Sequence, residues 1–273
     1  MKIQIGFSAE VSKSEDVVEP RPVDAPTIAS RKSIARVHFP ARNMTLDYYN
    51  DQFDLHRGDL VFVDGKLEGL RGRVVDVTYH FKIKLSDYKR VIAVADTKVS
   101  GTFQLAGSHF VTFDKDSLPF EKVVTWFCPP EKDGEEYVSG YDDKTFDLEN
   151  LEEMGVSAII AERGHDYYMR NKVVYISVDE NGKGRAIVEG TKPYIVEFDC
   201  ENGLVSDLTC TCFCNYRCKH EFATMLQLKE TLDLIMKHYK DQYEEHEYFA
   251  AISKAAFLNF ALDSKESGSF TLN

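Results

Sequence analysis

The sequence predicts an α+β protein, with an N-terminal small antiparallel β-barrel and a C-terminal β-meander followed by two helices. Residues 34–126 contain short apolar runs separated by turn residues. Several runs alternate apolar and polar residues, as half-buried antiparallel strands do. Residues 221–239 instead repeat apolar side chains at helical spacing. A chain of 273 residues is long enough for two domains of ordinary size.

Composition divides the chain into four segments. Residues 10–33 are rich in Pro, Ser and charge and hold few large apolar groups, which is typical of a mobile arm. Residues 131–154 carry ten acids and two lysines, and such charge runs generally face solvent. We therefore expect a flexible arm at 1–33, a small β-barrel at 34–128, an acidic linker at 129–150 and a second domain at 151–273.

The second domain is expected to begin with a short helix at SAIIAERG, with Gly164 near its C-terminal end. Strands follow at KVVYISV, RAIVEG, YIVEFD and LVSDLTC, and the turn residues DENGKG join the first two as a hairpin. After the helix at 221–239, the stretch EYFAAISKAAFLNFAL is expected to form a second helix.

Charge is distributed unevenly along the chain. The whole chain carries −12, which argues against nucleic acid as a partner. Residues 1–130, however, hold 18 Lys and Arg against 17 Asp and Glu, a net of +1, whereas the remainder holds 15 against 28, a net of −13. The average therefore does not exclude nucleic-acid binding by the first half.

Residues 65–90 concentrate the basic side chains of the first half, with seven Lys and Arg against three acids and with aromatic residues between them. Aromatic rings stack on bases and cations neutralise phosphates. The candidate nucleic-acid contacts are Arg71, Arg73, Lys82 and Lys84. Alternating lysines also keep a sheet edge soluble, and this alternative stays open.

The first residues lack the apolar run and cleavage site of a signal peptide, and no apolar stretch approaches the roughly 20 residues that span a bilayer. We therefore expect a cytoplasmic protein with no membrane partner. Thiols stay reduced in the cytoplasm, which disfavours a disulfide role for the cysteines.

Four of the six cysteines and one histidine lie within residues 210–220. Cys210 and Cys212 end a predicted strand, where residues two apart point to one face. If Cys218 and His220 were both fully helical, they would lie roughly 200° apart around the helix axis. We therefore expect Cys218 in the turn and His220 in the first helical turn. Three thiolates and one imidazole form a closed tetrahedral set that suits one structural Zn²⁺.

Two alternatives concern the same cluster. Cys214 lies between the proposed ligands and could replace Cys210, since Cys212 and Cys214 are also two apart. The cysteines could also be reduced thiols that bind no metal, although thiolates this close together repel one another and oxidise. A thioredoxin-type centre needs Cys-x-x-Cys, and that spacing does not occur here.

The pattern Cys-x-Cys-x5-Cys-x-His resembles the SWIM zinc finger family. The preceding GTKPYIVEFDCENGLVSDLTCTC and the following CKHEFATML are also similar to that family, so the resemblance covers roughly residues 155–235. The five-residue gap is at the short end of the family's usual range. The resemblance implies a non-catalytic zinc-binding accessory protein that recognises nucleic acid or helps to assemble a nucleic-acid complex, because SWIM members occur in transposases, chromatin remodellers and recombination factors. It also implies an alternative, a protein–protein adaptor with the zinc domain as its platform.

In the first half, HRGDLVFVDGKLEGLRGRVVDVTYHFKIKL resembles KOW-type SH3-like segments and the β-barrel region of PSP1-type proteins. That resemblance implies contact with DNA or RNA, although glycines that satisfy tight turns explain much of the pattern. The sequence contains no phosphate-binding loop, nucleophile elbow or metalloprotease motif. We therefore expect no catalytic residues and a function other than that of an enzyme.

Overall fold

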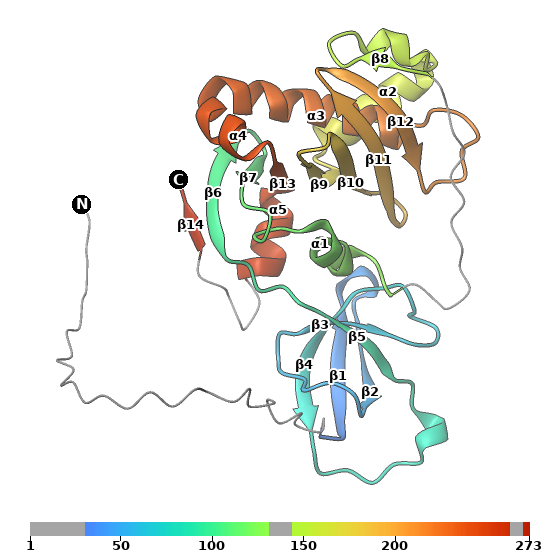
Figure 1. Cartoon of the computed structure of the whole chain (residues 1–273). Helices are drawn as coiled ribbons and strands as arrows, with labels where there is room; N and C mark the ends of the chain where they lie inside the picture. The colour runs from blue at the N-terminus through green and yellow to red at the C-terminus, as the bar shows by residue number, and fades with distance from the viewer. Residues whose placement is uncertain (1–30, 131–143, 263–269) are drawn as a thin grey trace, which may run out of the picture.

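The computed structural model describes residues 31–130, 144–262 and 270–273, and it has the α+β fold that the sequence predicts (Figure 1). Most of the expected arm at 1–33, namely residues 1–30, and residues 131–143 of the expected linker lie outside the described residues. Ser33, the last residue of the expected arm, begins the first strand. Within the described ranges, no helix is both long enough and apolar enough to cross a membrane.

A five-stranded antiparallel sheet forms the first unit, in the order β2-β1-β4-β3-β5. Alternate residues of β1 point inward, and Val37 and Phe39 are fully buried. The two edges of the sheet approach each other at one isolated parallel bridge, between Tyr49 of β2 and Arg90, the residue before β5. The predicted barrel is therefore a curled sheet, not a fully closed barrel. Its strands are β1 (Ser33–Phe39), β2 (Met44–Asn50), β3 (Leu60–Val63), β4 (Gly72–Thr78) and β5 (Val91–Ala95), and its 3-10 turns are η1 (Pro40–Arg42) and η2 (Leu85–Asp87).

A nine-stranded sheet forms the second unit, in the order β14-β6-β7-β13-β9-β10-β11-β12-β8. The predicted meander is present as β9 to β12, each strand antiparallel to the next. The strands are β6 (Gly101–Ala106), β7 (His109–Thr112), β8 (Phe146–Asp147), β9 (Val173–Val178), β10 (Lys183–Glu189), β11 (Pro193–Glu201), β12 (Leu204–Cys210), β13 (Phe249–Ser253) and β14 (Phe270–Leu272).

Helices pack around this larger sheet (Figure 1). The long helix α3 packs against α2 and against strands of the meander. Gly164 was expected near the C-terminal end of its helix, but it lies in the interior of α2. It is buried where α2 packs on Phe222 of α3. The helices are α1 (Phe120–Phe127), η3 (Leu151–Met154), α2 (Ala158–Met169), α3 (Lys219–His238), α4 (Lys240–His246), α5 (Lys254–Phe257) and η4 (Leu258–Leu262).

The boundary between the two units differs from the expected position after residue 128. Strands β6 and β7 lie in the nine-stranded sheet, where β7 pairs with β13. The first sheet therefore ends at Ala95. Alternation of apolar and polar residues identifies a strand but carries no information about the sheet that the strand joins. At the other boundary, β8 pairs with β12, so residues of the expected linker form an edge of the second sheet.

The expected second C-terminal helix is present only in its second half, as α5 and η4. Residues 249–253 form β13, which pairs with β7 on one side and β9 on the other. All five of its side chains are buried. The sequence of a strand that is buried on both faces is a continuous apolar run. The periodicity of apolar residues does not distinguish such a run from a buried helix.

The two units share buried surface. Leu60 and Ala95 of the first sheet belong to the same apolar cluster as Trp126 and Phe257 of the second unit. Arg73 of β4 donates a hydrogen bond to the backbone oxygen of Asn259 at 2.9 Å. The first unit is therefore packed directly on the second.

Candidate metal centre

The four predicted ligands come together where β12 leads into α3. Cys210 is the last residue of β12 and pairs with Val196 of β11. Cys218 is the N-cap of α3, and His220 lies in its first turn. One ligand atom from each of Cys210, Cys212, Cys218 and His220 lies within 4.8 Å of all the others. The structure thus gathers the set that contains Cys210, with Cys218 and His220 in the predicted turn and first helical turn. Cys212 lies in a bend after β12, not in the strand itself.

The spacing of these atoms fits a single tetrahedral ion. His220 Nδ1 lies 3.7 Å from Cys210 Sγ and 3.6 Å from Cys218 Sγ. Metal–sulfur bonds of about 2.3 Å and metal–nitrogen bonds of about 2.0 Å at tetrahedral angles place sulfur and nitrogen roughly 3.6 Å apart. The cluster could therefore hold a metal ion with little movement of its side chains.

Close contact between the sulfurs, together with burial, shifts the pKa values of the three thiols. The Cys210 thiol hydrogen-bonds to Cys218, which lowers the pKa of Cys218 to about 4 and raises that of Cys210. Burial is the main cause that raises the pKa of Cys212 to about 12. These contacts therefore favour ionisation of Cys218 and disfavour ionisation of Cys210 and Cys212. A metal ion binds thiolates, so its binding would release the remaining thiol protons.

A capping box fixes Cys218 at the start of α3. Its backbone N–H donates to Glu221 Oε2 at 2.6 Å, and its sulfur accepts from the N–H of Glu221. The Glu221 side chain is buried, and burial together with the negative charge of Cys218 raises its pKa to about 8. The cap satisfies backbone groups that a helix otherwise leaves without partners.

Two tyrosines hold the His220 ring, and the sequence analysis missed both. The Tyr194 ring stacks on it with centroids 4.1 Å apart, and the Tyr167 ring meets it edge-on at 5.4 Å. His220 Nε2 is buried and has no hydrogen-bond partner among the described residues. Tyr194 precedes Val196, the partner of Cys210, by two residues, so the side-chain period of a strand could have indicated it.

Cys214 lies outside the gathered set. Its side chain is exposed, whereas the four gathered residues are buried or half-buried. Cys128 and Cys200 are half-buried and pack against apolar clusters, as isolated cysteines usually do.

The four candidate nucleic-acid contacts do not form one patch. Arg71 Nη2 donates to Glu189 Oε1 of β10 at 2.9 Å, and Arg73 donates to the backbone oxygens of Gly58 and Asn259. Both arginines therefore help to join the two units. Lys82 and Lys84 are exposed in the loop that follows the other end of β4.

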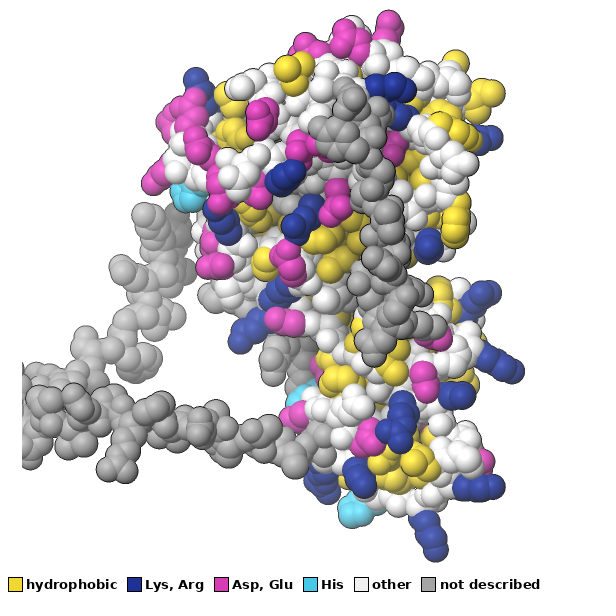
Figure 2. Space-filling model, turned by 45° about the vertical axis from the view of Figure 1, so that its right-hand side comes forward, with side chains coloured by type: hydrophobic (Ala, Val, Ile, Leu, Met, Phe, Trp, Pro, Cys, Tyr) yellow, Lys and Arg dark blue, Asp and Glu magenta, His cyan; other side chains and the backbone are white. Residues whose placement is uncertain are grey.

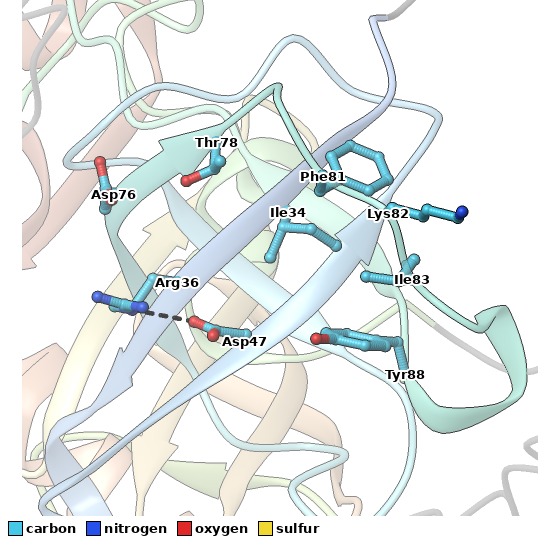
Figure 3. A pocket seen from close by; sticks show the side chains of 9 residues that line it. All are labelled: Ile34, Arg36, Asp47, Asp76, Thr78, Phe81, Lys82, Ile83 and Tyr88. Atoms are coloured by element: carbon cyan, nitrogen blue, oxygen red, sulfur yellow. Dashed lines mark hydrogen bonds and ion pairs between the residues drawn. The ribbon is translucent and has the colours of Figure 1, made fainter.

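Lys82 borders a shallow hollow of about 230 Å³ on the first unit. Figure 3 shows its amino group pointing outward, away from the ion pair between Arg36 and Asp47 across the hollow. Phe81 and Tyr88 also line this hollow. Lys82 thus lies beside aromatic side chains and presents its charge to solvent.

Comparison with known proteins adds no relative: no protein-family model, curated protein or solved structure matches this chain. What the chain does is therefore inferred from the side chains described above.

Proposed function

We propose that this chain is a non-catalytic zinc-binding accessory protein that binds nucleic acid. The metal assignment rests on the set of three sulfurs and one imidazole that lie within 4.8 Å of one another, on residues that are buried or half-buried. Thiolate and imidazole ligands in tetrahedral geometry favour Zn²⁺ over Mg²⁺, Ca²⁺ or Mn²⁺. Four protein ligands leave no coordination position for a reactive water, so the ion would be structural. The resemblance of the Cys-Lys-His helix start to SWIM zinc fingers supports the same assignment.

The first unit would supply the contacts to phosphate. Lys82 and Lys84 are exposed on one loop, with Phe81 and Tyr88 beside them. Figure 2 shows Lys and Arg side chains projecting around the first unit. Arg71 and Arg73 are excluded from this role because their side chains already bind the second unit. Exposed cations beside aromatic rings suit a flexible polyanion, in which phosphates and bases alternate.

The experiment is to measure binding of labelled single- and double-stranded oligonucleotides to the zinc-loaded chain across a salt series. Affinity should fall as salt rises, because each phosphate contact contributes roughly 0.7 to 0.9 to the slope of log K against log salt. The double variant Lys82→Ala/Lys84→Ala should bind more weakly and have a shallower slope. Lys237→Ala is the matched control, since it removes an exposed positive charge from α3, in the second unit.

A protein–protein adaptor is the second candidate. Residues 131–273 carry a net charge of −13, and Asp and Glu gather over the second unit in Figure 2, where they repel phosphates. If no oligonucleotide binds even at low salt, the nucleic-acid proposal is refuted and the adaptor role is favoured. In that case the zinc ion would still stabilise the second unit, because binding free energy at such a site adds to folding free energy.

A further inference from the structure

The loop between Cys212 and Cys218 exposes two aromatic rings. Phe213 is 94% exposed and Tyr216 is 67% exposed, the two highest values among the large hydrophobic side chains of the described residues. The loop joins β12 to α3, so its ends are fixed by the four gathered ligands. Burial of apolar surface drives folding, and rings held in water at both positions therefore add little to the stability of the isolated chain.

One lysine lies beside the Phe213 ring, and a second lies beside the ring of a neighbouring tyrosine. The Lys192 amino group lies 5.5 Å from the Phe213 ring centroid and 5.9 Å from that of Tyr194. The Lys219 amino group lies 4.3 Å from the Tyr167 centroid. The loop and its neighbours thus place cations directly beside aromatic faces.

Acidic residues are missing from the same part of the sequence. The stretches 190–196 and 208–220 contain Lys192, Arg217 and Lys219 and no Asp or Glu, in a half of the chain that is otherwise strongly acidic. The next acid, Glu221, is buried in the cap of α3. A divalent ion with three thiolates would leave one negative charge, which the three cations outweigh.

From these observations we infer that the metal-held loop is a stacking platform for single-stranded nucleic acid, with Phe213 and Tyr216 as the base-stacking rings. Bases of any identity have a flat π face, and cations beside the rings neutralise the connecting phosphates. The inference rests on the proposed function and adds a second contact surface to it. In Figure 1 the loop after β12 lies at the outer edge of the second unit, where it leads into the start of the long helix α3.

The test is fluorescence anisotropy of a labelled 12-nucleotide single strand, either oligo-dT or oligo-U, titrated with the zinc-loaded full chain. Phe213→Ala should weaken binding roughly 5- to 100-fold, the range found for loss of one base–aromatic stack. Phe213→Leu should weaken it similarly, because leucine keeps an apolar side chain but has no ring. Phe213→Tyr keeps the ring and should bind within about twofold of the wild type.

Ile159→Ala is the matched control, since Ile159 is an apolar residue on α2 that is 61% exposed. Each variant is first checked for its zinc content, because a lost metal would move the loop. Wild-type affinity for Phe213→Leu would overturn the stacking platform and indicate an ordinary apolar contact. If Phe213→Ala binds the oligonucleotide as tightly as the wild type while Lys82→Ala/Lys84→Ala binds it more weakly, the stacking platform is refuted and the proposed function stands. No binding by the wild type would refute both.

Discussion

At the scale of single residues, the metal centre depends on how the His220 ring is held. Nδ1 faces the sulfurs, and the ring plane is set by Tyr194 on one side and Tyr167 on another. Metal-bound histidines usually donate their second N–H to an oxygen, which fixes the ring. Here stacking takes over that orienting role, because Nε2 has no hydrogen-bond partner among the described residues.

A first prediction distinguishes the two possible ligand registers. Cys210→Ser should reduce the zinc content from about one ion per chain to near zero, because three remaining ligands bind weakly and leave one position open. Cys214→Ser should keep the ion, since Cys214 is exposed and outside the gathered set. Elemental analysis of the purified variants measures both. Loss of zinc from Cys214→Ser with retention in Cys210→Ser would contradict this assignment.

A second prediction concerns His109, which is buried in β7 far from the thiols in sequence. Its Nε2–H donates to the Val173 carbonyl at 2.7 Å, so the Ser108 hydroxyl donates to Nδ1. Burial is the main cause that lowers the pKa of His109 to about 4; the Val173 hydrogen bond opposes this shift, and the charge of Lys254 adds to it.

The unfolded chain therefore binds a proton near pH 6.5 that the folded chain does not bind until about pH 4. Stability due to neutral His109 is complete above pH 6.5 and falls as pH decreases toward 4, by up to about 3 kcal/mol. Urea unfolding of the wild type and of His109→Gln between pH 4 and pH 7 measures the difference. If the free energy of unfolding changes with pH in the same way for both proteins, the prediction is contradicted.

At the scale of elements, the strands of the meander and the start of α3 could be predicted from the sequence because their patterns are local. Cys210 ends a strand, Cys212 follows it by two residues, and Cys218 and His220 begin a helix. Local spacing along the sequence was therefore enough to predict that the four ligands lie close together. β13 could not be predicted, because its buried run FAAIS has no period that separates strand from helix. The role of Arg71 depends on Glu189 and on rings distant in sequence, which no local pattern encodes.

A third prediction tests the contact between α2 and α3. A Cβ added at Gly164 would lie 2.8 Å from Phe222 Cδ1 and 3.0 Å from the backbone oxygen of Lys219, next to two ligands. Alanine gains about 1 kcal/mol of helix propensity over glycine, but overpacking costs roughly 1–3 kcal/mol.

Because a backbone atom cannot turn away as a side chain can, we expect Gly164→Ala to lower the free energy of unfolding and to weaken zinc binding. Thermal unfolding and a competition titration with a zinc chelator measure the two effects. The double variant Gly164→Ala/Phe222→Leu should recover part of both losses. If the single variant Gly164→Ala melts at a higher temperature than the wild type, the prediction is wrong, and α2 and α3 can move apart enough to accommodate the added methyl group.

At the scale of the whole molecule, Arg71 links the first unit to the second. Its guanidinium carbon lies 5.2 Å from the ring centroids of both Phe127 and Phe260, and its Nη2 donates to Glu189. Trp126, the single tryptophan, is buried beside Phe260 with centroids 5.8 Å apart. Tryptophan fluorescence therefore reports on the junction itself.

The last prediction is that Arg71→Ala uncouples the two units. Partly buried cation–π contacts contribute about 2 kcal/mol, and the variant also leaves Glu189 without its cation. Arg71→Lys should rescue little, because an ammonium group does not stack on two rings as the planar guanidinium does. In urea, the Trp126 fluorescence of Arg71→Ala should change at a lower concentration than its circular dichroism, whereas the two should coincide in the wild type. Coincident transitions in Arg71→Ala, at the wild-type midpoint, would mean that the shared apolar cluster around Leu60 and Ala95 holds the units together without Arg71.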